Sequence, residues 1–326
     1  IDEQFHAADE LGVRFAATRG SMDRGESDGG LPPDELVQDV DTILADSERL
    51  VKKYHDPSRF SMHSVALAPC SPFSVTTELL SESANLARKL GVRLHTHLCE
   101  TKDEEQFCME THNLRPLSYM EKVGWIGDDV WFAHGIWFND EELELLAATK
   151  TGVAHCPVSN MKLSSGVCRV PDMLKLGVPL GLAVDGSASN DCSNLLSELR
   201  ASYLLHRLTY SNAAPGGYEL IKIATRGSAA LLGRDDIGQI AAGKAADLFM
   251  LDADLLELAG TDADPASVPA TVGYARPAKL VMVNGNVIAE DGKLTGIDEA
   301  KVMRTADRKA RELCGREENQ PPNYSQ

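Results

Sequence analysis

The segment "LHTHLCE", residues 94–100, is a short apolar run whose end carries two histidines, a cysteine and a glutamate. Such a run is typical of a β-strand, and its polar residues fall where that strand would end. An imidazole binds zinc well, and Glu100, three residues beyond His97, can approach water beside such an ion. A lone histidine at a strand end is more often a hydrogen-bonded core residue, so the interpretation depends on the rest of the chain.

Strand-like segments of the same kind recur on both sides of this one, each followed by a helix or a loop. The strands are expected over residues 13–20, 61–70, 92–100, 130–138, 152–160 and 178–186. The helices are expected over residues 1–11, 32–56, 75–91, 102–124, 139–150 and 171–177. Such alternation predicts parallel strands joined by right-handed crossovers.

Polar residues collect after these strands, in "RGS", "PCS", "HLCE", "HGIW", "HCPVSN" and "DGSASND". Enzymes built on a (β/α)₈ barrel carry their catalytic groups at this end of several strands. A doubly wound sheet would favour a glycine-rich phosphate loop after an early strand, and none is evident. The predicted fold class is therefore α/β, a TIM-like (β/α)₈ barrel. Because six strands do not close such a barrel, we expect the first two strands to lie upstream of Ile1.

The pattern changes after a helical stretch at 217–233. Residues 237–252 and 278–294 are short apolar runs broken by Gly-Lys or Asn-Gly turns, which is typical of hairpins in a small β domain. We therefore expect three parts: the barrel over 1–235, the β domain over 236–300, and a C-terminal helix and disordered tail over 301–326.

Composition narrows the possible partners. The net charge of −17 disfavours nucleic acids and anionic membranes, because phosphate contacts need clustered Lys and Arg. A small neutral or cationic substrate is more compatible with it. The seven cysteines are odd in number and form no CxxC pair, which favours reduced thiols in a cytoplasmic protein. The sequence shows no signal peptide and no apolar run of spanning length.

Four strand ends supply the candidate chemistry: His97 with Glu100, then His134, His155 and Asp185. Each type of side chain can bind a metal or move a proton. Four such strand ends in succession are hard to attribute to chance. They predict a metal site with a carboxylate that can move a proton.

Four residues are candidates for lining a substrate pocket, each with a structural alternative. His155, with Asn160, either lines the pocket or anchors the turn after its strand. Cys70 faces the substrate or belongs to the core, where cysteine is frequent. Trp137 stacks on a flat ring or packs internally.

Taken together, these segments resemble the amidohydrolase superfamily in its deaminase and chlorohydrolase branch. The resemblance covers nearly the whole chain, from "RGSMDRGESDGGLPP" through "HTHLCET", "FAHGIWF", "AHCPVSNMKLSSG" and "LAVDGSASND" to "VMVNGNVI". Within the branch, "SDGGLPP", "APCSPFSV" and "DGSASND" look most like 8-oxoguanine deaminases and hydroxylated-triazine aminohydrolases. The resemblance implies the barrel, a small β-sandwich and a homodimer.

The resemblance also implies one divalent metal ion, zinc or iron, held by an HxH pair on the first strand, a histidine on the fifth and an aspartate on the eighth. His97 and Asp185 match the last two, whereas the HxH pair has no counterpart in this chain. By the same resemblance Glu100 protonates a ring nitrogen, His134 holds the attacking oxygen, and Asp185 accepts a proton from water.

The implied reaction is deamination of a small amino-substituted heterocycle. We expect 8-oxoguanine first, and a hydroxylated s-triazine or a pterin such as isoxanthopterin next. Two alternatives stay open. One is a hydrolase that breaks a C–N or C–Cl bond without deamination, and the other is an inactive barrel fragment.

Overall fold

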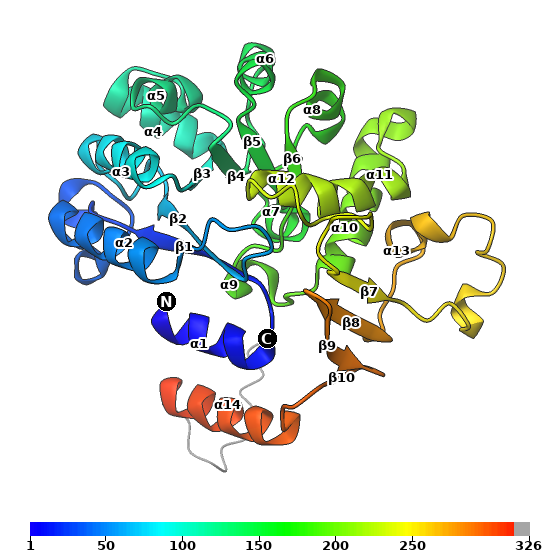
Figure 1. The fold of residues 1–326 in the computed structure, drawn as a ribbon. Coiled ribbons are helices and arrows are strands. Elements are labelled where there is room, and N and C mark those ends of the chain that lie inside the picture. The colour runs from blue at the N-terminus through cyan, green and yellow to red at the C-terminus, as the bar shows by residue number, and fades with distance from the viewer. Residues whose placement is uncertain (316–326) are drawn as a thin grey trace.

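The computed structural model describes residues 1–315, and its larger part is built on one parallel β-sheet (Figure 1). The six strands pair in sequence order, and each neighbouring pair is parallel. They are β1 (Phe15–Ser21), β2 (His63–Pro69), β3 (Leu94–Leu98), β4 (Val130–His134), β5 (Gly152–His155) and β6 (Leu180–Leu182). The predicted parallel α/β architecture is confirmed.

Helices connect the strands, and α2, α3, α6 and α8 lie along the outer side of the sheet (Figure 1). The α-helices up to residue 231 are α1 (Asp2–Leu11), α2 (Val40–Tyr54), α3 (Thr77–Leu90), α4 (Lys102–His112), α5 (Pro116–Lys122), α6 (Asp140–Thr149), α7 (Pro157–Lys162), α8 (Val170–Leu176), α9 (Ser187–Asn190), α10 (Leu195–Tyr210), α11 (Gly217–Lys222) and α12 (Ser228–Leu231). A π-helical turn, Ile223–Gly227, joins α11 to α12.

Local sequence sets the ends of these helices. The side chain of Thr76 accepts the Leu79 N–H at the start of α3, and Gly91 ends that helix in the left-handed conformation, φ 70°. Asn139 and Glu142 form a capping box at the start of α6. Short helices therefore begin and end at defined residues, which fixes the loops that follow each strand.

The helix predicted over 32–56 begins later than expected, at Val40. Asp39 caps it by accepting the Thr42 N–H, and Val37 before it is extended. Asp34–Leu36 forms only a short 3₁₀ turn, and Leu36 is 57% exposed instead of buried. The hydrogen bond to Asp39 therefore determines where this helix begins, and the apolar spacing upstream of it does not.

Two other helical predictions need correction. The stretch 102–124 is two helices, because Asn113 adopts φ 54° and ends α4, and Pro116 opens α5. The helix α10 lies over 195–210, where the alternating pattern predicts no element. Asn194 accepts the Leu196 N–H at its start, a capping bond that marks the beginning of a helix.

A separate antiparallel sheet follows the last barrel helix, in the order β10-β9-β8-β7. The Asn-Gly turn between β8 and β9 is confirmed, but of residues 237–252 only β7 is a strand. The elements are β7 (Leu248–Met250), β8 (Leu280–Val283), β9 (Asn286–Glu290), β10 (Lys293–Leu294), the short helix α13 (Val268–Thr271) and the C-terminal helix α14 (Glu299–Leu313).

No helix or strand is predicted between the two apolar runs, over residues 252–270. The structure has two 3₁₀ turns and the start of α13 there. The disordered tail predicted from Glu317 lies outside the described residues. The three domain boundaries stay predictions. Arg14, just before β1, pairs with Asp247 at the start of β7 and so attaches the small sheet to the large one.

The core lies between the sheet and its helices. One close backbone contact joins the π-helical turn to β6. Gly227, in the π-helical turn, packs on β6 so tightly that an added Cβ atom would lie 1.9 Å from the carbonyl oxygen of Leu180. Only glycine fits there, because a backbone carbonyl cannot move aside as a flexible side chain can. This contact supports the strand that leads to Asp185.

We therefore expect Gly227→Ala to lower the free energy of unfolding by about 1–3 kcal/mol, the usual cost of overpacking. Gly20→Ala is the matched control, because an added Cβ at Gly20 meets nothing within 4 Å. That control should stay within about 0.5 kcal/mol of the unchanged chain. Urea unfolding measures both, and equal stability of the two variants would contradict the close contact.

Candidate metal and catalytic site

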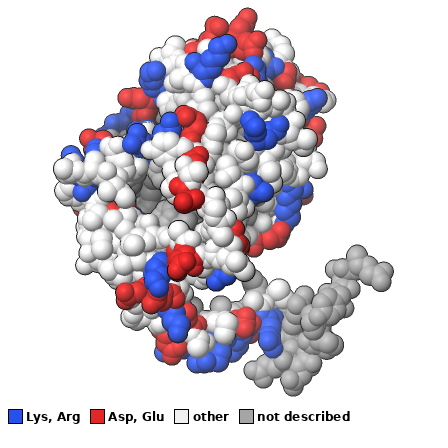
Figure 2. All heavy atoms as spheres, turned by 90° about the vertical axis from the view of Figure 1, so that its right-hand side faces the viewer, with Lys and Arg blue, Asp and Glu red and all other residues white. Residues whose placement is uncertain are grey.

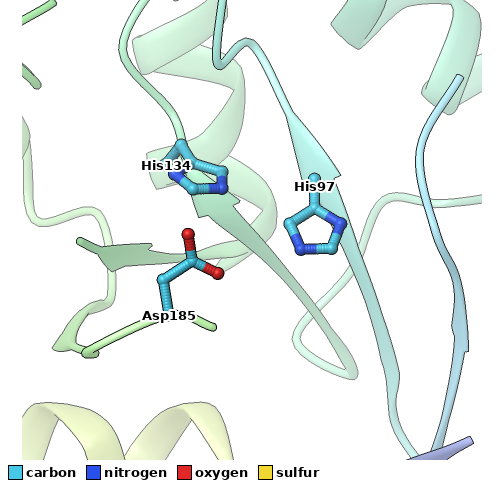
Figure 3. A group of neighbouring side chains, drawn as sticks. All are labelled: His97, His134 and Asp185. Carbon is cyan, nitrogen blue, oxygen red and sulfur yellow. The ribbon is translucent and has the colours of Figure 1, made fainter. Parts of the chain in front are cut away.

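Three polar side chains meet where β3, β4 and β6 end (Figure 3). His97 lies on β3, His134 ends β4, and Asp185 follows β6. One ligand atom of each lies within 4.8 Å of the others. Two atoms that bind the same zinc ion lie at most about 4.2 Å apart, so a small side-chain shift suffices for one ion to contact this group. The donor set, two imidazoles and a carboxylate, also suits such an ion.

The backbone at this edge is bent into an uncommon conformation. Cys99, His134 and Asp185 all have positive φ angles, 54°, 71° and 67°. Positive φ is unfavourable for residues with a Cβ atom and persists where the surroundings enforce it, often at functional sites. These bends turn the chain sharply after each strand and leave the side chains facing the shared space.

His97 is held by the loop that follows β2. Its Nδ1–H donates to the carbonyl oxygen of Cys70 at 2.5 Å, so Nε2 is the ring atom that a metal can bind. Burial lowers the pKa of His97, but the contacts with Cys70, whose sulfur lies 3.9 Å from Nδ1, and the charge of Asp185 outweigh it and raise the pKa to about 9. A metal that binds Nε2 therefore displaces a proton from it.

Asp185 is kept ionised by two hydroxyls. Ser159 and Ser189 both donate to its Oδ2, at 2.6 and 2.8 Å, so its other oxygen is available. Burial raises the pKa of Asp185, yet these two bonds and the Gly186 N–H outweigh it and the pKa lies below the usual value. An ionised carboxylate with one oxygen available is a suitable metal ligand.

His134 connects the metal group to Glu100. Its Nδ1–H donates to the side-chain oxygen of Asn160 at 2.9 Å, and its Nε2 lies 3.5 Å from Oε2 of Glu100. Ser165 donates to the other oxygen of Glu100 at 3.4 Å. The structure thus places Glu100 beside the three strand-end residues, on the turn after β3.

The remaining predicted pocket residues are less closely joined to this group. Cys70 contacts His97, as described, and is half-buried. Trp137 donates its ring N–H to the Ser165 carbonyl, and the Lys102 ammonium lies 4.6 Å from its ring centre. His155 is 1% exposed and packs edge-on against His206 of α10, with ring centres 5.1 Å apart.

Sequence reasoning missed several supporting side chains. Ser159 and Ser189, which hold Asp185, lie in "CPVSN" and "DGSASND", but single serines carry no distinctive pattern. Glu104 was also missed, although it is 1% exposed and accepts the Cys99 and Glu100 N–H groups. A charged residue four positions before buried Cys108, on the same face of α4, was the available signal.

The fold and this site define a class, the metal-dependent hydrolases whose polar residues follow parallel strands. Comparison with known sequences identifies the family. The model of the "Amidohydrolase family" matches residues 1–288, so the chain belongs to the amidohydrolase family.

Named relatives place it in the predicted branch. The chain is 48% identical over 303 residues to an 8-oxoguanine deaminase of Pseudomonas aeruginosa, covering 93% of this chain and 67% of that protein. It is 43% identical over 310 residues to a hydroxydechloroatrazine ethylaminohydrolase of Pseudomonas sp. strain ADP, covering 94% and 64%. The predicted aminohydrolase class is confirmed. The chain spans about two thirds of the length of these relatives.

A solved structure agrees with the fold. The atrazine chlorohydrolase of Arthrobacter aurescens TC1, complexed with zinc, superposes with a TM-score of 0.91 at 34% identity, covering 94% of this chain and 68% of that one.

On the face of the molecule in Figure 2, acidic and basic side chains are interspersed. No helix within residues 1–315 is both long and apolar enough to cross a membrane.

We expect His97→Ala to weaken zinc binding by this chain at least about 100-fold, because a ligand is lost outright where losing a supporting partner already costs 10–100-fold. His6→Ala is the control, since His6 lies exposed on α1. Competition with a chelating dye measures both affinities. Equal zinc affinity in the two variants would remove His97 from the metal group.

Proposed function

We propose that this protein is a zinc-dependent deaminase of a flat amino-substituted heterocycle, with 8-oxoguanine as the first substrate. The observation that carries the proposal is the arrangement of Glu100 next to the group His97, His134 and Asp185. A metal ion held by such side chains activates bound water, and a neighbouring carboxyl group can protonate the ring of the substrate. The names and identities of the relatives support the choice of substrate.

We assign the metal ligands of this chain to His97 and Asp185. Zinc is the proposed ion because a similar structure contains it, and iron accepts the same kinds of ligand. When bound, a divalent ion lowers the pKa of water from 15.7 towards about 7. The hydrogen bonds on Nδ1 of His97 and Oδ2 of Asp185 orient the two groups for this task.

The side chains then divide the proton transfers of the reaction. Asp185 takes a proton from water as the oxygen adds to the ring carbon that bears the amino group. His134 accepts a hydrogen bond from that water at Nε2, because its Nδ1–H is committed to Asn160. Glu100 gives its proton to the adjacent ring nitrogen. The proton held by Asp185 leaves with the amino group as ammonia when the C–N bond breaks. The hydroxyl proton on the same ring carbon returns to Glu100, which leaves a ring carbonyl and restores the acid.

Recognition of the ring is assigned to Cys70, Trp137, His155 and Asn160. Cys70 is the best supported of these, because its sulfur lies beside the ring of His97 and can contact a substrate there. Asn160 acts by holding His134. For His155 the contact with His206 supports a role in shaping the wall behind the site.

The wider architecture is also part of the proposal. β1 and β6 each pair on one side only within residues 1–315, and two more strands, one carrying the HxH pair, would complete an eight-stranded barrel. The small sheet would likewise belong to a β-sandwich, in the domain division 1–235, 236–300 and 301–326. A cytoplasmic homodimer acting on a small molecule is the proposed state.

Ammonia release from 8-oxoguanine by the complete, zinc-loaded protein tests the substrate. Hydroxylated s-triazines and isoxanthopterin are the alternative amino substrates, and chloride release from a chlorotriazine tests the alternative reaction. We expect the highest kcat/KM for 8-oxoguanine. Chloride release without ammonia release would contradict the proposed deamination, and no release from any substrate would favour an inactive barrel.

The role of Glu100 is tested by Glu100→Gln in the same protein. We expect turnover to fall by about 10²–10⁴-fold, because general acid–base catalysis contributes that much, while zinc content stays unchanged. Ammonia release is the assay, and metal analysis is the control for the site. Turnover equal to that of the unchanged protein would refute the assignment.

A further inference from the structure

We propose that Glu104, in the first turns of α4, is a positioning residue for Glu100. The side chain of Glu104 accepts the backbone N–H of Cys99 at 2.7 Å and that of Glu100 at 3.3 Å, one on each carboxylate oxygen. These two hydrogen bonds hold the backbone of the turn that carries Glu100, the proposed proton donor. The inference rests on the proposed function, in which Glu100 protonates the ring.

Burying the carboxylate of Glu104 costs free energy, and a role in the site would explain why this residue is retained there. The residue is 1% exposed, and taking a carboxylate out of water is unfavourable because it loses its hydration. Its two hydrogen bonds come from neutral backbone groups, so they do not cancel its charge. Burial raises the pKa of Glu104 to about 7, and those two bonds only partly oppose it. An apolar side chain would fill the same space at lower cost.

The turn that Glu104 grips is otherwise held from the opposite side. The carbonyl oxygen of Cys99 accepts the N–H groups of Ile136 and Trp137, at 2.8 and 3.0 Å, in the loop after β4. Cys99 itself has φ 54°, so the chain leaves the strand conformation there, and its N–H bonds to a side chain. Glu104 binds that N–H, and the two sets of bonds fix the turn from both ends.

The geometry of the site depends on this turn. Glu100 approaches Nε2 of His134, the last residue of the neighbouring strand β4. A misplacement of about 1 Å in a reacting group can reduce turnover about 100-fold. Glu104 thus acts on the reaction through the backbone of Glu100, without touching a substrate.

Glu104→Gln tests this with little change in size. The amide keeps one acceptor oxygen but sets an NH₂ group against the second N–H, so one of the two bonds is lost. The matched control is Glu110→Gln, the same substitution on the same helix, because Glu110 is exposed and its carboxylate accepts from the side chain of Gln106, one helical turn away. Both variants are made in the complete, zinc-loaded protein.

Two measurements distinguish positioning from a loss of structure. The first is kcat for ammonia release in H₂O and D₂O. We expect kcat to fall about 10–100-fold in Glu104→Gln with little change in KM, and the solvent isotope effect to rise, because proton transfer from a misplaced Glu100 becomes slower. A smaller folded fraction would reduce kcat equally in both solvents. The second is backbone hydrogen exchange of residues 96–101, which we expect to quicken in Glu104→Gln alone.

The outcomes separate the two proposals. Unchanged kcat and exchange in Glu104→Gln, beside an active unchanged protein, would overturn the positioning role alone. A fall in kcat with an unchanged isotope effect would assign Glu104 to stability and also overturn it. If the unchanged protein releases no ammonia from any amino heterocycle, the proposed function fails, and this inference fails with it.

Discussion

Parallel pairing in sequence order is the constraint on which the site depends. Because every strand of the large sheet runs the same way, each one ends at the same edge, and residues far apart in sequence meet there. The register between β3 and β4 sets Leu98 opposite His134, so His97 lies one step back on the neighbouring strand. Asp185 arrives from β6, two strands further on. The three ligand atoms therefore lie within 4.8 Å of one another, although they come from three different strands.

Buried glutamates hold the loops at this edge. Glu104 binds the turn after β3, and Glu142 both caps α6 and forms a double hydrogen bond with Arg115, which also contacts the Trp137 carbonyl. Glu198 of α10 accepts the Val158 N–H and the side chain of Asn190, close to the loop that carries Asp185. In each case a helix supplies the carboxylate, and the donor lies in a loop or at a short helix near the carboxyl ends of the strands. These hydrogen bonds tie the segments after the strands to the helices behind them.

The sequence allowed the parallel sheet and the meeting of His97, His134 and Asp185 to be predicted, because hydrophobic period and polar strand ends are local signals. It did not reveal Glu104, Ser159 or Ser189, whose roles depend on which backbone groups lack partners after folding. The start of α2 was mispredicted for a related reason. Apolar spacing extended upstream, but capping at Asp39 determined the boundary.

The ion pair between Arg14 and Asp247 also bears on the order of assembly. These partners are 233 positions apart, so during synthesis the guanidinium leaves the ribosome long before its carboxylate exists. The pairs β1–β2 through β5–β6 need only neighbouring segments and can form as the chain emerges. The small antiparallel sheet is made after the six parallel strands. Its docking on Arg14 then joins the start of β7 to the residue just before β1.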